Sequence, residues 1–147
     1  GARAAGIKVG IYFFTQAISE VEAVEEASMC LSLVEGKKIT YPIFIDVESA
    51  TNGRANGLSK DARTAIVKAF CKTIANGGYK AGVYANKNWF TNYLNTSELT
   101  GYSIWLAQYA ASPSYTATRY DYWQYSSKGS VAGIKGNVDM DISFLGY

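Results

Sequence analysis

Histidine is absent from this chain of 147 residues, and cysteine occurs only twice. The absence of histidine excludes Ser-His-Asp and Cys-His nucleophile systems and argues against a zinc site. The sequence also lacks a Walker motif and a G-x-G-x-x-G motif, so no phosphate-binding loop is indicated. Cys30 and Cys71 fall inside helical patterns and are expected to be buried free thiols, with a disulfide as the alternative. Carboxylates and tyrosines must therefore carry most of any chemistry.

Charge and hydropathy exclude further classes of protein. The net charge of +2 is small and scattered, which argues against a nucleic-acid partner. No apolar run approaches a membrane span, and no signal-peptide pattern precedes the first predicted helix. The hydrophobic share of 48% predicts one domain with a real core. The 12 tyrosines and 3 tryptophans suit flat, hydroxyl-rich ligands such as sugars, although aromatic residues at this level more often belong to the core and the general surface.

Apolar strand patterns alternate with helical patterns along the chain. Residues 1–6 read as the end of a helix. Strands are predicted at 7–14, 41–49, 81–86, 103–109, 121–126 and 137–141, and helices at 19–35, 59–76 and 88–94. This order favours βα units and a parallel sheet, either an open doubly wound sheet or an incomplete barrel. The strands near the two ends of the chain, at 7–14 and 137–144, are expected to form the edges of the sheet.

The strand at 41–49 ends in two acidic residues. Because side chains alternate along a strand, Asp46 and Glu48 share one face, roughly 6.5–7 Å apart along the strand. A solvated loop explains such a pair without any function. Both candidate folds, however, bind ligands at the carboxyl ends of their strands, where Asn86, Tyr109 and Ser126 also lie. This convergence favours a functional role for the two carboxylates.

Five stretches carry motifs in a fixed order along nearly the whole chain. They are GIKVGIYFF at 6–14, PIFIDVE at 42–48, GVYAN at 82–86, IWLAQY at 104–109, and WQY at 123–125 followed by GNVD at 136–139. Together they resemble the glycoside hydrolase family 25 muramidases, the Chalaropsis-type lysozymes. The resemblance implies a modified TIM-like (β/α) barrel without cofactor or metal. It also implies cleavage of the β-1,4 bond between N-acetylmuramic acid and N-acetylglucosamine in bacterial peptidoglycan, by a secreted or cell-wall-associated enzyme.

The same resemblance implies roles for individual residues. Glu48 would be the general acid, Asp46 would orient or stabilise the reacting sugar, and Asp139 would be a further acidic residue of the site. For the reaction we favour the substrate's 2-acetamido group as nucleophile, held by Asp46, over a covalent aspartyl intermediate. The residues expected to bind the substrate are aromatic: Tyr12, Phe14, Tyr84, Trp105, Tyr109 and Trp123.

One family motif is missing. Family members begin with a strand that bears Asp-x-Ser, and nothing in this sequence resembles it. Residues 1–147 are therefore expected to form a single catalytic domain of this family that lacks its first strands, with weak or no activity. We also expect the open edges to pair with another copy or with an upstream segment. The alternatives are a non-catalytic remnant that binds cell-wall glycan and another carboxylate glycosidase such as a chitinase. Residues 41–45 lack the acids that chitinases place there.

Overall fold

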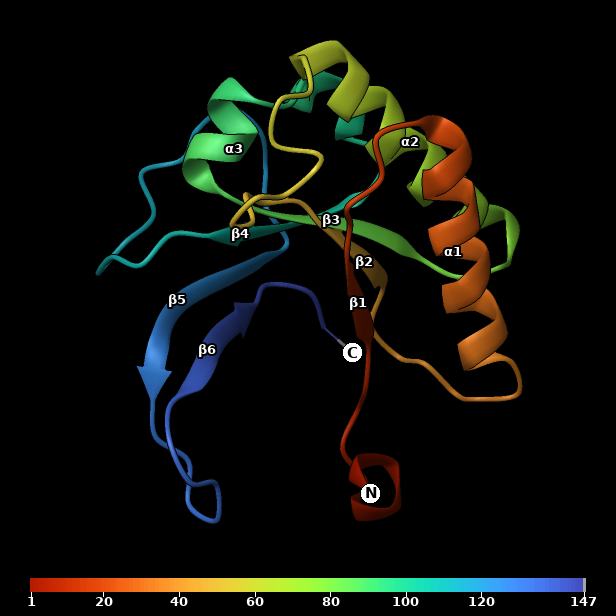
Figure 1. Ribbon diagram of the computed structural model, residues 1–147. Helices are drawn as coiled ribbons and strands as arrows, with labels where there is room; N and C mark the ends of the chain where they lie inside the picture. Colours follow the sequence, from red (N-terminus) through yellow and green to blue (C-terminus); the bar gives the residue numbers. More distant parts are fainter. Residues whose placement is uncertain (147) are drawn as a thin grey trace.

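Six strands form one sheet, and helices cover one of its faces (Figure 1). The computed structural model describes residues 1–146. The strands are β1 (Ile11–Phe14), β2 (Ile43–Asp46), β3 (Ala81–Asn86), β4 (Ser103–Ala107), β5 (Tyr122–Gly129) and β6 (Val138–Ser143). The helices are α1 (Glu20–Val34), α2 (Lys60–Asn76), α3 (Lys87–Asn92) and two short 3-10 helices, η1 (Ala2–Ala5) and η2 (Thr96–Leu99). All six predicted strands and all three predicted helices are present, whereas η2 was not predicted.

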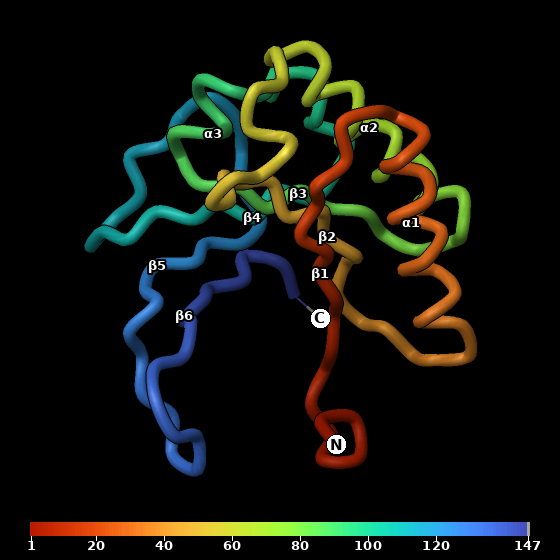
Figure 2. Tube along the Cα trace, in the orientation of Figure 1, coloured from red at the N-terminus to blue at the C-terminus, as the bar shows by residue number. Residues whose placement is uncertain are grey.

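The strands lie side by side in the order of the sequence, from β1 at one edge to β6 at the other. The first five are parallel, and β6 runs antiparallel to β5. Figures 1 and 2 show that the sheet curls, with β5 and β6 turned away from the helices. This curled α/β half-barrel confirms the predicted incomplete TIM-like fold and both predicted edges. The antiparallel last strand was not predicted; its short connection leaves no room for the crossover that a parallel strand needs.

Side-chain caps fix the starts of the two long helices. Ser19 accepts a hydrogen bond from the backbone N–H of Glu22 at 3.3 Å, and Ser59 accepts one from Ala62 at 3.2 Å. The Glu22 carboxylate in turn accepts the N–H of Ile18 at 2.8 Å, one residue before the position expected for a capping box. The predicted helix starts are therefore confirmed. In the described part of the chain, no helix is both long and apolar enough to cross a membrane.

The hydrophobic core lies between the sheet and the helices. Ile43, Ile45 and Val47 point into it from β2 and the residue that follows, as strand alternation predicts. Cys30 and Cys71 are buried in the same core as free thiols, which confirms their prediction. Burial raises the pKa of both thiols, so they stay protonated at neutral pH.

Aromatic rings fill the opposite, concave face of the sheet. Phe44 meets Trp105 and Tyr122 edge-on, with ring centroids 5.1 and 5.4 Å apart. The Phe44 ring also lies against Gly82, where an added Cβ would stand 2.3 Å from the Phe44 Cε1 atom. Glycine is therefore required at this point of β3, because any side chain would displace the ring.

A buried arginine links α2 to α3 and to the loop between β2 and α2. The guanidinium of Arg63 lies 4.6 Å from the ring centre of Trp89 and 5.5 Å from that of Tyr93. It donates hydrogen bonds to the carbonyl oxygens of Ala55 and Asn56, each at 3.2 Å, and of Tyr93 at 3.3 Å. Backbone carbonyls and aromatic ring faces thus stabilise the positive charge of Arg63.

Candidate active site

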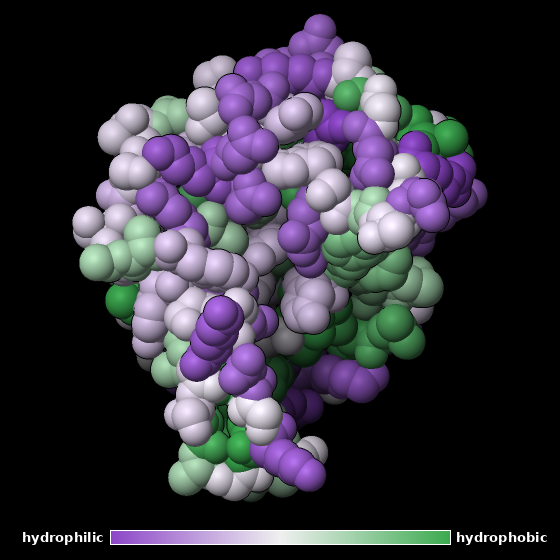
Figure 3. Space-filling model, turned by 60° about the vertical axis from the view of Figure 1, so that its left-hand side comes forward, coloured by the Kyte–Doolittle hydropathy of each residue, from purple (hydrophilic) through white to green (hydrophobic). Residues whose placement is uncertain are grey.

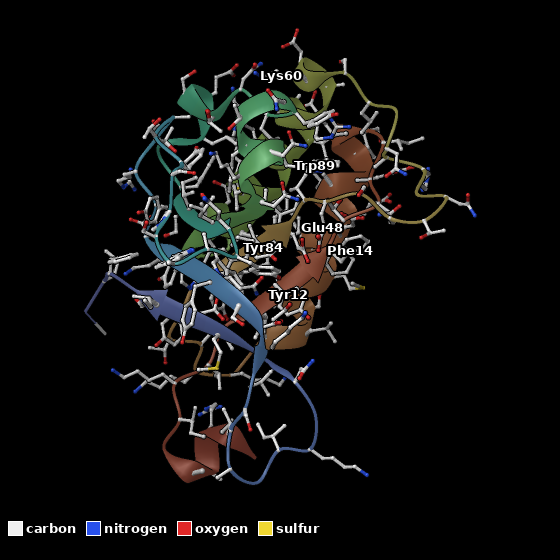
Figure 4. All side chains as sticks on the ribbon, turned by 90° about the vertical axis from the view of Figure 1, so that its left-hand side faces the viewer. Tyr12, Phe14, Glu48, Lys60, Tyr84 and Trp89 are labelled. Atoms are coloured by element: carbon white, nitrogen blue, oxygen red, sulfur yellow. The ribbon has the colours of Figure 1, made fainter. Side chains whose placement is uncertain are left out.

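A pocket of about 140 Å³ opens on the concave face at the carboxyl ends of the parallel strands. All six strands contribute to it, and its lining consists of Tyr12, Asp46, Glu48, Tyr84, Trp105, Gln124 and Asp139. Figure 4 shows the side chains of Tyr12, Glu48 and Tyr84 around one space. The face turned toward the viewer in Figure 3 is hollowed near its centre, with hydrophilic side chains above the hollow and hydrophobic ones below it. The sequence-based expectation that Asp46, Glu48, Tyr84 and Asp139 share a cavity is met.

Asp46 is the most deeply buried carboxyl of this pocket, with 6% of its surface exposed. Burial raises its pKa to about 7, and the charge of Glu48 and a hydrogen bond with Glu48 act in the same direction. Its Oδ1 atom has no hydrogen-bond partner among the described residues. The backbone of Asp46 is fixed, because its carbonyl accepts the N–H of Thr15 at 3.1 Å. The site therefore holds one carboxyl that is partly protonated at neutral pH and has an acceptor atom to spare.

Glu48 stands between this pocket and a second one. It lies two residues beyond Asp46 and is half-buried. The Val47 N–H between them donates to the carbonyl of Tyr84 at 2.9 Å, so the pairing with β3 continues up to Glu48. The second pocket has a volume of about 370 Å³ and is lined by Glu48, Tyr84, Asn86, Lys87, Asn88, Ala107, Gln108 and Tyr109. Glu48 can thus exchange a proton with a group bound across the boundary of the two pockets.

Gln124 is a site residue that the sequence did not single out. It is 4% exposed, and its Oε1 accepts hydrogen bonds from the hydroxyls of Tyr84 and Tyr109, both at 2.8 Å. Burial and the neighbouring acidic groups raise the pKa of Tyr84, so its hydroxyl remains a donor. One amide oxygen therefore orients two tyrosines, of which Tyr84 lines both pockets and Tyr109 lines the second.

Trp123 was predicted to bind the substrate, and the structure shows that this prediction is wrong. Because side chains alternate along β5, Gln124 faces the pocket and Trp123 faces the core. The Trp123 indole donates to the carbonyl of Gln108 at 2.8 Å, and its ring lies 5.6 Å from that of Tyr125. Trp123 therefore stabilises the fold and lines neither of the two pockets.

The other predicted aromatic residues lie around the two pockets. Tyr12 is 64% exposed and lines the first pocket from β1. Phe14 is outside both linings, although its register pairs it with Asp46 and Figure 4 shows it near Glu48. Trp105 lines the first pocket, and its indole donates to Asp141 on β6 at 2.8 Å. The hydrogen bond attaches the rim of the pocket to the edge strand.

Comparison with known proteins decides the family. A sequence profile of Glycosyl hydrolases family 25 matches residues 1–134. The chain belongs to glycosyl hydrolase family 25. It is 31% identical over 141 residues to the autolytic lysozyme of Clostridium acetobutylicum, covering 96% of this chain and 41% of that protein.

Solved structures agree with this family membership. The modular autolysin LytC from Streptococcus pneumoniae superposes with a TM-score of 0.84 at 25% identity, over 95% of this chain and 34% of that one. The muramidase from Trichobolus zukalii has a TM-score of 0.78 at 21% identity, over all of this chain and 72% of that one, and shares its fold. The chain thus spans less than half of the lysozyme and of LytC.

No group of three or more His, Cys, Asp or Glu side chains is placed to hold a metal ion among residues 1–146. Asp46 and Glu48 place two carboxyl groups at the end of one strand, and the raised pKa of Asp46, about 7, allows it to bind or release a proton near neutral pH.

Proposed function

We propose that this family 25 chain is a glycoside hydrolase with muramidase (lysozyme) activity. Its substrate is peptidoglycan, and it cleaves the β-1,4 bond between N-acetylmuramic acid and N-acetylglucosamine. The observation that carries this proposal is the shared pocket of Asp46 and Glu48 at the carboxyl end of β2. We also propose that residues 1–147 act as one catalytic domain, secreted or attached to the cell wall. The similarity to the autolytic lysozyme of Clostridium acetobutylicum supports the muramidase assignment.

In this mechanism Glu48 is the general acid. It donates a proton to the glycosidic oxygen while the bond from that oxygen to C1 breaks. The carbonyl oxygen of the substrate's 2-acetamido group then forms a bond to C1, and Asp46 accepts the hydrogen bond from the amide N–H. The unpartnered Oδ1 of Asp46 supplies this acceptor. Water finally attacks C1, the bond from C1 to the acetamido oxygen breaks and restores the acetamido group, and the water gives a proton to the Glu48 carboxylate, which restores both residues. Asp139, on the opposite wall, adds negative charge near the developing cation.

The Glu48→Gln variant tests the proposal. Loss of general acid catalysis should slow cell-wall clearing by about 10²–10⁴-fold, because glutamine cannot donate the proton. The measurement is the turbidity of a cell-wall suspension, together with pull-down of the variant on the same walls. The Glu25→Gln variant changes an exposed carboxylate on α1 and should behave like the unchanged protein.

Four outcomes separate the candidate functions. Clearing lost and binding kept in Glu48→Gln supports the muramidase. Clearing kept in Glu48→Gln excludes Glu48 as the acid. Wall binding without clearing by the unchanged protein favours the non-catalytic glycan-binding module, and cleavage of chitin in place of peptidoglycan favours the chitinase.

A further inference from the structure

The second pocket contains a lysine beside the proposed acid. Lys87 is the first residue of α3, is half-buried, and shares the lining of this pocket with Glu48. In the part of the chain that the structure describes, no carboxylate lies within ion-pair distance of Lys87. A partly buried cation without a counter-ion at the wall of a pocket is available for an anionic group from outside.

A hydrogen-bond network holds the Lys87 ammonium in place. Its Nζ donates to the Ser114 hydroxyl at 2.7 Å. The Gln108 side chain also donates to this hydroxyl, at 2.9 Å, and accepts the Ser114 backbone N–H at 3.1 Å. A serine hydroxyl has two acceptor positions and one donor, and both acceptor positions are now occupied. Two of the three ammonium N–H groups of Lys87 therefore remain to donate to a ligand.

Two asparagines of the pocket also present donors. The side-chain oxygen of Asn86 accepts the backbone N–H of Trp89 at 3.0 Å. The oxygen of Asn88 accepts the side-chain N–H of Asn92 at 2.6 Å. With both amide oxygens in use, the remaining amide N–H groups of Asn86 and Asn88 are left for a ligand. The pocket thus combines one fixed cation with several hydrogen-bond donors, an arrangement that matches a carboxylate.

We infer that the second pocket binds a carboxylate carried by the glycan substrate, and that Lys87 is the residue that contacts it. This inference rests on the proposed function. The lactyl ether of N-acetylmuramic acid ends in a carboxyl group, which is either free or extended by a peptide that has carboxylates of its own. A polymer of N-acetylglucosamine alone has none. Lys87 therefore makes the enzyme prefer an acidic glycan to a neutral one.

Binding to matched glycans tests the inference without relying on hydrolysis. Titration calorimetry in the Glu48→Gln background uses three ligands: peptide-free glycan with free lactyl carboxyls, the same glycan as its methyl ester, and a fragment that keeps its peptides. Lys87→Met removes the charge and keeps a chain of similar length. Lys60→Met is the control, because Lys60 is exposed on α2 and lies far from Glu48 in Figure 4.

Lys87→Met should weaken binding of a carboxylate glycan about tenfold at low salt and less at high salt. Binding of the methyl ester should stay unchanged, as should every affinity of Lys60→Met. If Lys87→Met loses affinity for the peptide-free glycan, Lys87 contacts the lactyl carboxylate. If it loses affinity only for the peptide-bearing fragment, Lys87 contacts a peptide carboxylate. Equal affinity of the Glu48→Gln protein for the free-acid glycan and its methyl ester would overturn this inference. If the unchanged protein still clears walls, the proposed function stands. Binding to none of the ligands, with no clearing by the unchanged protein, overturns the proposed function and the inference together.

Discussion

At the scale of single residues, the burial of Asp46 has the largest consequence. A buried carboxyl favours its neutral form, and the neighbouring Glu48 adds to this preference. The folded chain therefore binds a proton at Asp46 that the unfolded chain would release. The same property that prepares the site for acid–base chemistry makes the folded state less stable as the pH rises.

The Asp46→Asn variant should remove this pH dependence. The pKa of Asp46 is about 7 in the folded chain and about 3.9 when unfolded. The stabilisation that Asp46 gives the folded state is therefore fully present below about pH 4 and is lost as the pH rises through 7. The difference corresponds to about 4 kcal/mol in the free energy of unfolding. We expect urea unfolding between pH 4.5 and 7.5 to show a steeper loss of stability in the unchanged protein than in the variant. Equal slopes in the two proteins would contradict the assignment.

The sequence predicted the acidic residues of the site but not the whole site. Strand alternation and the motif at 42–48 were sufficient for Asp46 and Glu48, because both depend on local spacing. Gln124 was missed because an uncharged amide between two aromatic residues has no pattern of its own. Trp123 was placed on the wrong face because the inward side of β5 is set by the curl of the sheet. The pKa of Asp46 also depends on burial, which local sequence does not contain.

At the scale of elements, the contact between β2 and β3 sets the shape of the concave face. The Phe44 ring of β2 lies so close to β3 that only glycine fits at position 82. The rings of Trp105 and Tyr122 then pack against Phe44 from β4 and β5. One missing side chain on β3 therefore allows rings from three strands to meet below the pocket.

Gly82→Ala should destabilise the fold by about 1–3 kcal/mol, because the added methyl group forces Phe44 out of its position. Gly101→Ala is the matched control, since nothing lies within 4 Å of an added Cβ there. The measurement is the free energy of unfolding in urea for both variants. A loss for Gly82→Ala no larger than that for Gly101→Ala would show that the ring adjusts without cost.

At the scale of the whole molecule, the strands at the edges of the sheet have fewer hydrogen-bonded neighbours than those in the middle. Strands β2 to β5 each have two hydrogen-bonded neighbours, while β1 and β6 each have one among the described residues. The interior amides of the helices and of β3 should therefore exchange most slowly with solvent, and those of β1 and β6 fastest.

Hydrogen exchange measured by mass spectrometry over a series of protein concentrations tests this order. Exchange in β1 and β6 that does not change with concentration indicates that the edges stay open in the isolated chain. Protection of both edges that increases with concentration indicates pairing with a second copy, one of the two partners that we expected from the sequence. Fast exchange in β3 would contradict the strand order itself.

The number and order of the strands were predictable, whereas their closure was not. Apolar runs between helical patterns identify each strand locally, and Ser19 and Ser59 mark the helix starts. The antiparallel direction of β6 depends on contacts between distant segments. The choice between an open sheet and a curled one followed from the family resemblance rather than from spacing.

Arg63 lines neither of the two pockets, yet it links two segments that carry their charged groups. Its guanidinium ties the loop that follows Glu48 to the end of α3, the helix that begins with Lys87. If glycan crosses from one pocket to the other as proposed, loosening this link by Arg63→Lys should change the length of sugar unit that binds best, although Arg63 lines neither pocket.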